Sequence, residues 1–70
     1  MTAVNLGQRN GRIISRTEKS SPKGYIYQVL LDDNTTTAVV ERSNIKRHVN
    51  DEYVINVFGD TNFNTFVRKL

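Results

Sequence analysis

Basic side chains are the residues whose type and spacing most favour a chemical role in this chain. The sequence has ten Lys and Arg against seven Asp and Glu, a formal net charge of +3. Five of the cations, offset only by Glu18, fall within residues 9–23: Arg9, Arg12, Arg16, Lys19 and Lys23. A second basic group lies in residues 42–48 and comprises Arg42, Lys46, Arg47 and His48. Exposed Lys and Arg bind phosphate oxygens without sequence preference and with an affinity that falls as salt rises. Both groups therefore predict nucleic-acid binding, more strongly if the fold brings them to one face.

Aromatic side chains could add to such a surface. Tyr25 and Tyr27 alternate along a segment of strand-like composition and would share one face. Exposed aromatic rings stack bases in proteins that bind single strands. The alternative is that aromatic residues fill the core of a small domain, and we expect this of Phe58, Phe63 and Phe66.

Catalytic and metal-binding patterns are missing from the sequence. The chain has no cysteine, and His48 is its only histidine, so neither a thiolate metal site nor a triad is indicated. Asp32, Asp33 and Asn34 begin like a calcium loop, but the glycine and distal glutamate of such a loop do not follow. Seventy residues also leave little room for an enclosed active site. We expect a non-enzymatic protein with no catalytic residue, no metal and no cofactor.

The elements that must position these residues are predicted to be strands. Five segments are rich in β-branched or aromatic residues, or alternate in polarity: residues 12–18, 25–32, 35–42, 52–58 and 63–69. The loop at 19–24 contains Pro22 and Gly24, and Asp33-Asn34 predicts a tight hairpin. A second hairpin loop is expected at 59–62. Residues 25–32 are apolar on both faces, which favours a central strand.

Two segments are less regular. Residues 43–50 allow a short helical turn, because Ser43 can cap it and Ile45 and Val49 would share a face; continuation of the preceding strand is the alternative. Residues 1–11 are polar and contain two glycines, which favours a flexible N-terminal arm. We therefore expect an arm at 1–11 and a single domain at 12–70.

Five short strands, the loop at 19–24 and the turn at 43–49 resemble the SH3-like barrel class, which includes the KOW and Tudor barrels. Two strands follow the turn here, which departs from that class. An OB-like barrel is the alternative. Either resemblance implies an all-β fold, a small five-stranded barrel with up to one short helical turn. Neither carries a functional residue over to this chain.

The sequence thus predicts a binding module whose first candidate partner is DNA or RNA. The alternative is a protein–protein module, in which a barrel edge or the face of Tyr25 and Tyr27 docks a protein partner or a second copy in a homo-oligomer. Small phage-type accessory proteins that bind or inhibit a host protein share this size. No secretory signal or long apolar run is present, so we expect no membrane association and a location in the cytoplasm of a cell or infected host.

Overall fold

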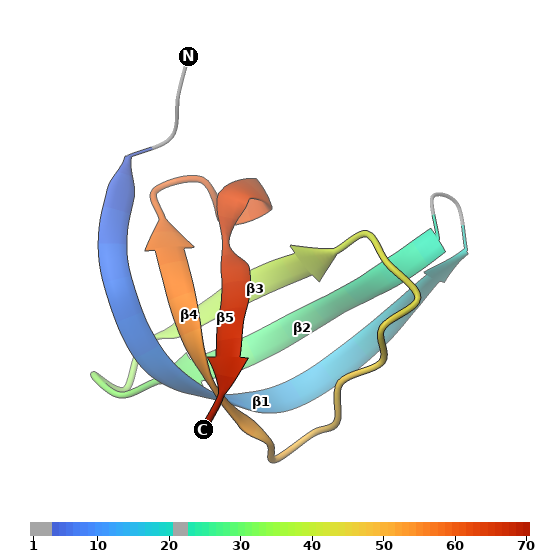
Figure 1. Cartoon of the computed structure of the whole chain (residues 1–70), viewed down its shortest axis with the longest axis horizontal. Coiled ribbons are helices and arrows are strands. Elements are labelled where there is room, and N and C mark those ends of the chain that lie inside the picture. The colour runs from blue at the N-terminus through green and yellow to red at the C-terminus, as the bar shows by residue number, and fades with distance from the viewer. Residues whose placement is uncertain (1–3, 21–22) are drawn as a thin grey trace.

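The described residues, 4–20 and 23–70 of a computed structural model, form one antiparallel sheet of five strands (Figure 1). In chain order these are β1 (Asn5–Ser20), β2 (Lys23–Leu31), β3 (Thr36–Glu41), β4 (Glu52–Phe58) and β5 (Thr65–Lys69), with a 3₁₀ turn η1 (Thr61–Phe63) before β5. The all-β prediction is confirmed. No helix in the described part of the chain is long and apolar enough to cross a membrane.

The spatial order of the strands is β3-β2-β1-β4-β5. Two hairpins join the first three strands, and β4 returns after a long connection to lie beside β1. This is a Greek-key arrangement. It depends on β1, whose first half pairs with β4 and whose second half pairs with β2.

The strand β1 bends where its two partners change over. A register shift between Ile13 and Ser15 marks a bulge, which increases the local twist. At Gly11, an added Cβ would lie 2.5 Å from Cγ1 of Val29 and 3.0 Å from Cδ1 of Ile55. Only a residue without a side chain lets β1 cross the core this closely.

The expected N-terminal arm is wrong for residues 5–11. These residues pair with β4 from Asn5 to Gly11. All of these residues except Gly11 are exposed. Their polar composition therefore reflects a strand whose two faces are in contact with solvent. Residues 1–3 of the predicted arm lie outside the described residues.

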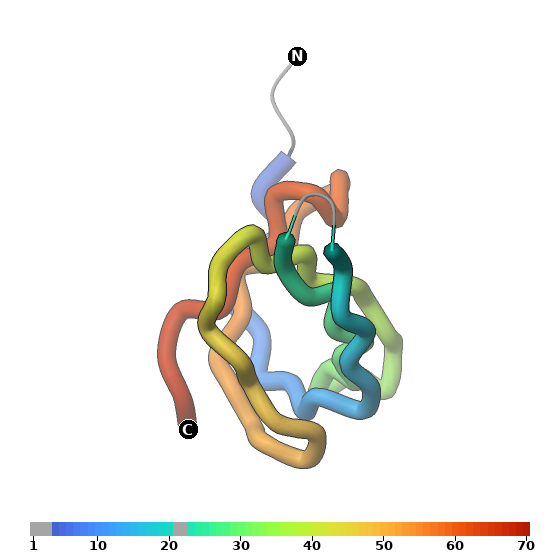
Figure 2. The backbone as a smooth tube through the Cα atoms, turned by 90° about the vertical axis from the view of Figure 1, so that its right-hand side faces the viewer, coloured from blue at the N-terminus to red at the C-terminus, as the bar shows by residue number. Residues whose placement is uncertain are grey.

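The sheet curls until its two edge strands, β3 and β5, face one another, and the backbone forms a ring in Figure 2. The concave side carries the core, in which Ile13, Tyr27, Val29, Val39 and Ile55 are fully buried. The edges β3 and β5 do not pair as strands. Backbone pairing therefore does not close the sheet along this seam.

The strand predictions for 25–32, 35–42 and 52–58 are confirmed by β2, β3 and β4. The helical turn expected at 43–50 is wrong. In that segment the amide of Arg47 donates to the Tyr27 hydroxyl, and the amide of Asn50 donates to the Ile13 carbonyl. Bonds to other strands replace the local bonds of a helix.

The short helical turn is η1 instead. It occupies the end of the loop expected at 59–62 and the first residue of the strand expected at 63–69. It begins at Asp60, whose carboxylate accepts the amide hydrogen of Asn62. This turn leaves Phe63 about half exposed, which corrects its assignment to the core. Phe66 does pack against the core, and Phe58 is half-buried.

Candidate nucleic-acid interface

The ten cations divide into paired and unpaired ones. Four make ion pairs: Arg9 with Asp32 at 3.8 Å, Arg12 with Glu52 at 3.4 Å, Lys69 with Asp51 at 3.5 Å, and Arg47 with Glu41 at 2.7 Å. Arg9 and Arg12, from the first predicted cluster, therefore lie beside carboxylates on the half of β1 that pairs with β4. Their placement disfavours them as phosphate ligands.

The other six cations have no carboxylate within 4 Å among residues 4–20 and 23–70: Arg16, Lys19, Lys23, Arg42, Lys46 and Arg68. Four of these come from two segments that the fold brings together, namely the end of the β1–β2 hairpin and the start of the connection from β3 to β4. We call Lys19, Lys23, Arg42 and Lys46 the basic end.

Gly24 is the point of contact between the two segments of the basic end. It lies opposite Lys19 in the hairpin register and directly follows Lys23. Its backbone packs against Glu41 and Arg42 so closely that a Cβ there would meet the Glu41 carbonyl oxygen and come within 3.2 Å of the Arg42 Cα. Glycine at this position therefore lets the backbone at Arg42 pass directly beside the hairpin that carries Lys19 and Lys23.

The connection continues beside the second half of β1. Nη1 of Arg16 donates to the Arg47 carbonyl at 2.8 Å, so the connection passes Arg16 at the residue that follows the exposed Lys46. Figure 2 looks onto this side, where the hairpin and the 42–51 connection flank the mouth of the ring. Parts of both predicted basic clusters thus meet here.

Arg47 has a structural position that its sequence context does not indicate. Its Nε donates to Oε2 of Glu41 at 2.7 Å, and both side chains are largely buried. Its guanidinium carbon lies 4.9 Å from the ring centre of Tyr53 and 4.6 Å from that of Phe66. These contacts, and the hydrogen bond that its backbone amide donates to the Tyr27 hydroxyl, hold the connection over the barrel end. Arg47, predicted as a phosphate ligand, is instead an anchor for the loop that carries Lys46.

Tyr27 is fully buried, so the prediction that it stacks a base is wrong. Its ring meets Phe66 edge-on at 5.3 Å, and its hydroxyl accepts the Arg47 amide hydrogen at 2.8 Å. Burial raises the pKa of this hydroxyl above its ordinary value. The phenol therefore stays neutral and serves the core.

Tyr25 is half-buried beside the basic end, with its ring centre 6.0 Å from that of Tyr27. It lies between Glu18 on β1 and Glu41 on β3 in the sheet register. Glu41 is neutralised by Arg47, whereas Glu18 makes no ion pair with any described residue. Glu18 is thus the one carboxylate that opposes an anion at Tyr25.

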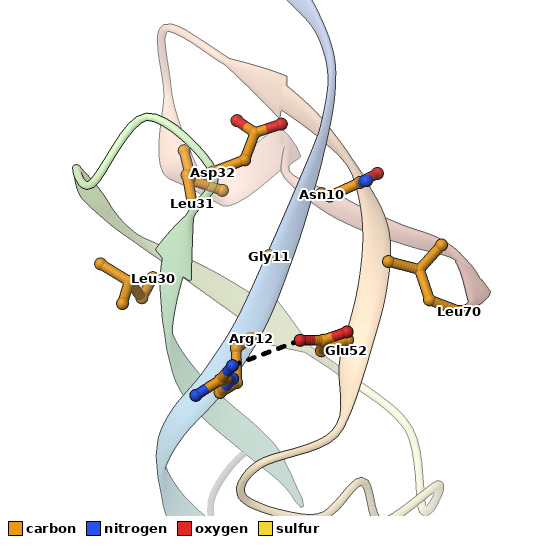
Figure 3. Close-up of a pocket in the computed structure, with 8 residues that line it drawn as sticks. All are labelled: Asn10, Gly11, Arg12, Leu30, Leu31, Asp32, Glu52 and Leu70. Carbon is orange, nitrogen blue, oxygen red and sulfur yellow. Dashed lines mark hydrogen bonds and ion pairs between the residues drawn. The ribbon is translucent and has the colours of Figure 1, made fainter.

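Two open clefts accompany these surfaces. The first, about 290 Å³, lies at the bend of β1; of its charged lining side chains, Arg12 and Glu52 face each other and Asp32 pairs with Arg9 (Figure 3). Each of these three charged side chains thus has a partner of opposite charge. The second, about 330 Å³, lies along the seam between β3 and β5, next to Arg42. The described residues contain no cluster of acidic, His or Cys side chains suited to a metal ion.

Comparison with protein-family models, curated proteins and solved structures finds no match for this chain. Interpretation of the site therefore depends on its own geometry. Sequence reasoning missed Gly24 and Asn64, which organise the basic end and the seam. Asn64 is one of eight asparagines, and nothing in its local sequence separates it from the others.

Proposed function

We propose that the protein binds nucleic acid through the basic end, using Lys19, Lys23, Arg42 and Lys46 as phosphate ligands. The observation that carries this proposal is the separation of charges: these four cations lack carboxylate partners among the described residues, whereas Arg9, Arg12 and Lys69 are paired elsewhere. Unpaired cations keep their full attraction for phosphates. The nucleic acid we propose is DNA or RNA in the cytoplasm of a cell or infected host.

The strand order supports the OB-like alternative for the barrel. A five-stranded, partly open Greek-key barrel is the architecture of OB-folds, whose β1–β2 loop takes part in oligonucleotide binding. In this chain the corresponding hairpin contributes Lys19 and Lys23 to the basic end. The SH3-like resemblance remains the second hypothesis for the fold family.

The proposed contacts are electrostatic and carry little sequence information. If all four side chains neutralise phosphates, the logarithm of affinity should fall with the logarithm of salt with a slope of about −3 to −4. Tyr25 can add partial stacking on an unpaired base, because this residue is only partly buried. Glu18 should weaken binding at that position by repelling the phosphate backbone.

Binding should be measured by fluorescence anisotropy with labelled single-stranded DNA, single-stranded RNA and duplex DNA over a salt series. The double variant Lys19→Ala/Lys23→Ala should weaken binding and reduce the salt slope by about 2. The variant Glu18→Gln should strengthen binding. The matched control Arg9→Ala/Arg12→Ala removes the same charge from paired cations.

The control variant Arg9→Ala/Arg12→Ala should retain most of the affinity for nucleic acid and most of the salt slope. Equal losses in the two double variants would show that net charge, and not the basic end, decides binding. Absence of binding at low salt, or binding without a salt slope, would also overturn the proposal.

A further inference from the structure

The edge strand β3 has an unpaired stretch of backbone beside the basic end. The Leu31 amide donates to the Thr35 carbonyl, so residues 35, 37, 39 and 41 direct their backbone groups toward β2. The carbonyl of Ala38 points the other way and accepts from Nδ2 of Asn64 at 2.8 Å. By the same alternation, the N–H and C=O of Val40 point into the seam, and neither has a partner among the described residues.

The seam is open at this position. Asn64 bridges β3 to the β4–β5 connection only as far as Ala38. Beyond it the cleft of about 330 Å³ is lined by the apolar Val39, Val40 and Phe66 and by Glu41, whose carboxylate is paired with Arg47. Arg42 and Ser43 also line it. An extended chain entering here would meet one free donor, one free acceptor and these apolar side chains.

These groups select a peptide backbone. A free donor and acceptor on one edge residue match the spacing of an added β-strand, which pairs through its main chain. The charges select the side chains of the partner. Arg42 lines the cleft, its backbone packs against Gly24, which directly follows Lys23, and neither cation has a carboxylate partner among the described residues. Acidic side chains would be attracted there.

A second copy of this chain is a poorer occupant. Self-pairing centred on Val40 would bring two basic ends of the same sign together, and each chain carries a net charge of +3. We propose that the β3 edge at Val40 binds an extended acidic segment of another protein by strand addition. This site goes beyond the proposed nucleic-acid binding, which needs the cations but not the backbone groups of Val40.

The test uses the full chain and a synthetic eight-residue peptide of alternating glutamate and valine, followed by ¹⁵N NMR. Amide shifts should concentrate at residues 39–43 and 65–67, and the Val40 amide should gain protection from hydrogen exchange. A peptide of alternating lysine and valine should not bind. The glutamate peptide with alternate backbone nitrogens methylated should lose binding, because it cannot pair as a strand.

The matched protein variants are Val40→Pro and Val40→Thr. Proline removes the N–H that points away from β2, so the β2–β3 ladder is kept, and peptide affinity should fall roughly tenfold. Threonine keeps the N–H and the branched side chain and should bind as the wild type does. Should Val40→Pro fail to fold, the methylated peptide on the wild-type chain still decides the question.

Equal binding of the methylated peptide would overturn strand addition and reduce the effect to attraction by the basic end. A dimer that forms through Val40 in sedimentation experiments would overturn the choice of occupant. The two proposals are tested separately. Val40→Pro should retain nucleic-acid binding. Lys19→Ala/Lys23→Ala should weaken nucleic-acid binding and lower the affinity for the glutamate peptide, but the Val40 amide should still gain protection when that peptide is bound.

Discussion

Replacing Asn64 should open the seam of the barrel. This side chain is 1% exposed. Its Oδ1 accepts the Phe58 amide hydrogen at 2.6 Å, and its Nδ2 donates to the Thr37 hydroxyl at 3.0 Å and the Ala38 carbonyl at 2.8 Å. One side chain thus joins β3 to the end of β4, across the two edges that do not pair.

The variant Asn64→Ala leaves the Phe58 amide and the Ala38 carbonyl without partners, and it removes a donor from the hydroxyl oxygen of Thr37. A buried group that loses its hydrogen bond costs about 1–3 kcal/mol. Both orphaned groups are only partly covered, so we expect a total loss of about 2–4 kcal/mol. That is a large share of the roughly 5 kcal/mol available to so small a domain.

The variant Asn64→Asp gives a sharper, pH-dependent signature. The carboxylate keeps an acceptor for the Phe58 amide, but it places a second oxygen against the Ala38 carbonyl. Burial raises the pKa of such a carboxyl in the folded state above its unfolded value. The folded state then gains stability as the pH falls through the folded pKa, and it loses that stability as the pH rises.

Urea denaturation followed by circular dichroism at neutral and acidic pH measures both effects. Asn62→Ala is the matched control, since it removes an exposed asparagine from the same loop. The reasoning is refuted if Asn64→Ala unfolds at the wild-type midpoint. It is also refuted if the stability of Asn64→Asp, relative to Asn64→Ala, does not change between the two pH values.

Three further perturbations test the core, the loop anchor and a turn. Gly11→Ala places a methyl 2.5 Å from Val29 and should cost about 1–3 kcal/mol in urea denaturation; an unchanged midpoint would contradict the close crossing. Tyr27→Phe removes the acceptor of the Arg47 amide and should cost about 1–2 kcal/mol and speed hydrogen exchange at that amide. Because burial raises the pKa of Tyr27, wild-type stability should fall as the pH rises above about 10, and the slope should be smaller in Tyr27→Phe. Asp33 accepts two hydrogen bonds within its turn, and these lower its pKa in the folded state. Its contribution to folding stability should therefore be present above the ordinary pKa of 3.8 and be lost as the pH falls through the pKa of the folded state. An NMR titration that gives Asp33 a pKa at or above 3.8 would contradict this.

Local chemistry determined three of the strands. Residues 25–32, 35–42 and 52–58 carry branched and aromatic side chains, and the Asp33-Asn34 turn between the first two is set by residues that tolerate its backbone; Asn34 has a φ of 68°. These preferences act within a few residues of the chain. They could therefore be recognised without knowledge of the fold.

The N-terminal half of β1 and the 43–50 segment depended on distant partners. Residues 5–11 have exposed side chains except at Gly11, so hydrophobic alternation could not reveal their pairing with β4. In the 43–50 segment, helical spacing was overridden because the amides of Arg47 and Asn50 bond to Tyr27 and Ile13. Tertiary hydrogen bonds outweigh a local preference of this size.

The sequence by itself determined which residues are basic, that they gather in two segments, and that the chain is a small β protein. Only the tertiary structure decided which of those charges are free. The carboxylate partners of Arg9, Arg12 and Arg47 lie 23, 40 and 6 positions away in the chain. Gly24, in contrast, lets the backbone at Arg42 pack against the hairpin that carries Lys19 and Lys23. Two charges pair only when they are close in space. The strand order β3-β2-β1-β4-β5 sets these distances, and the order of residues along the chain does not.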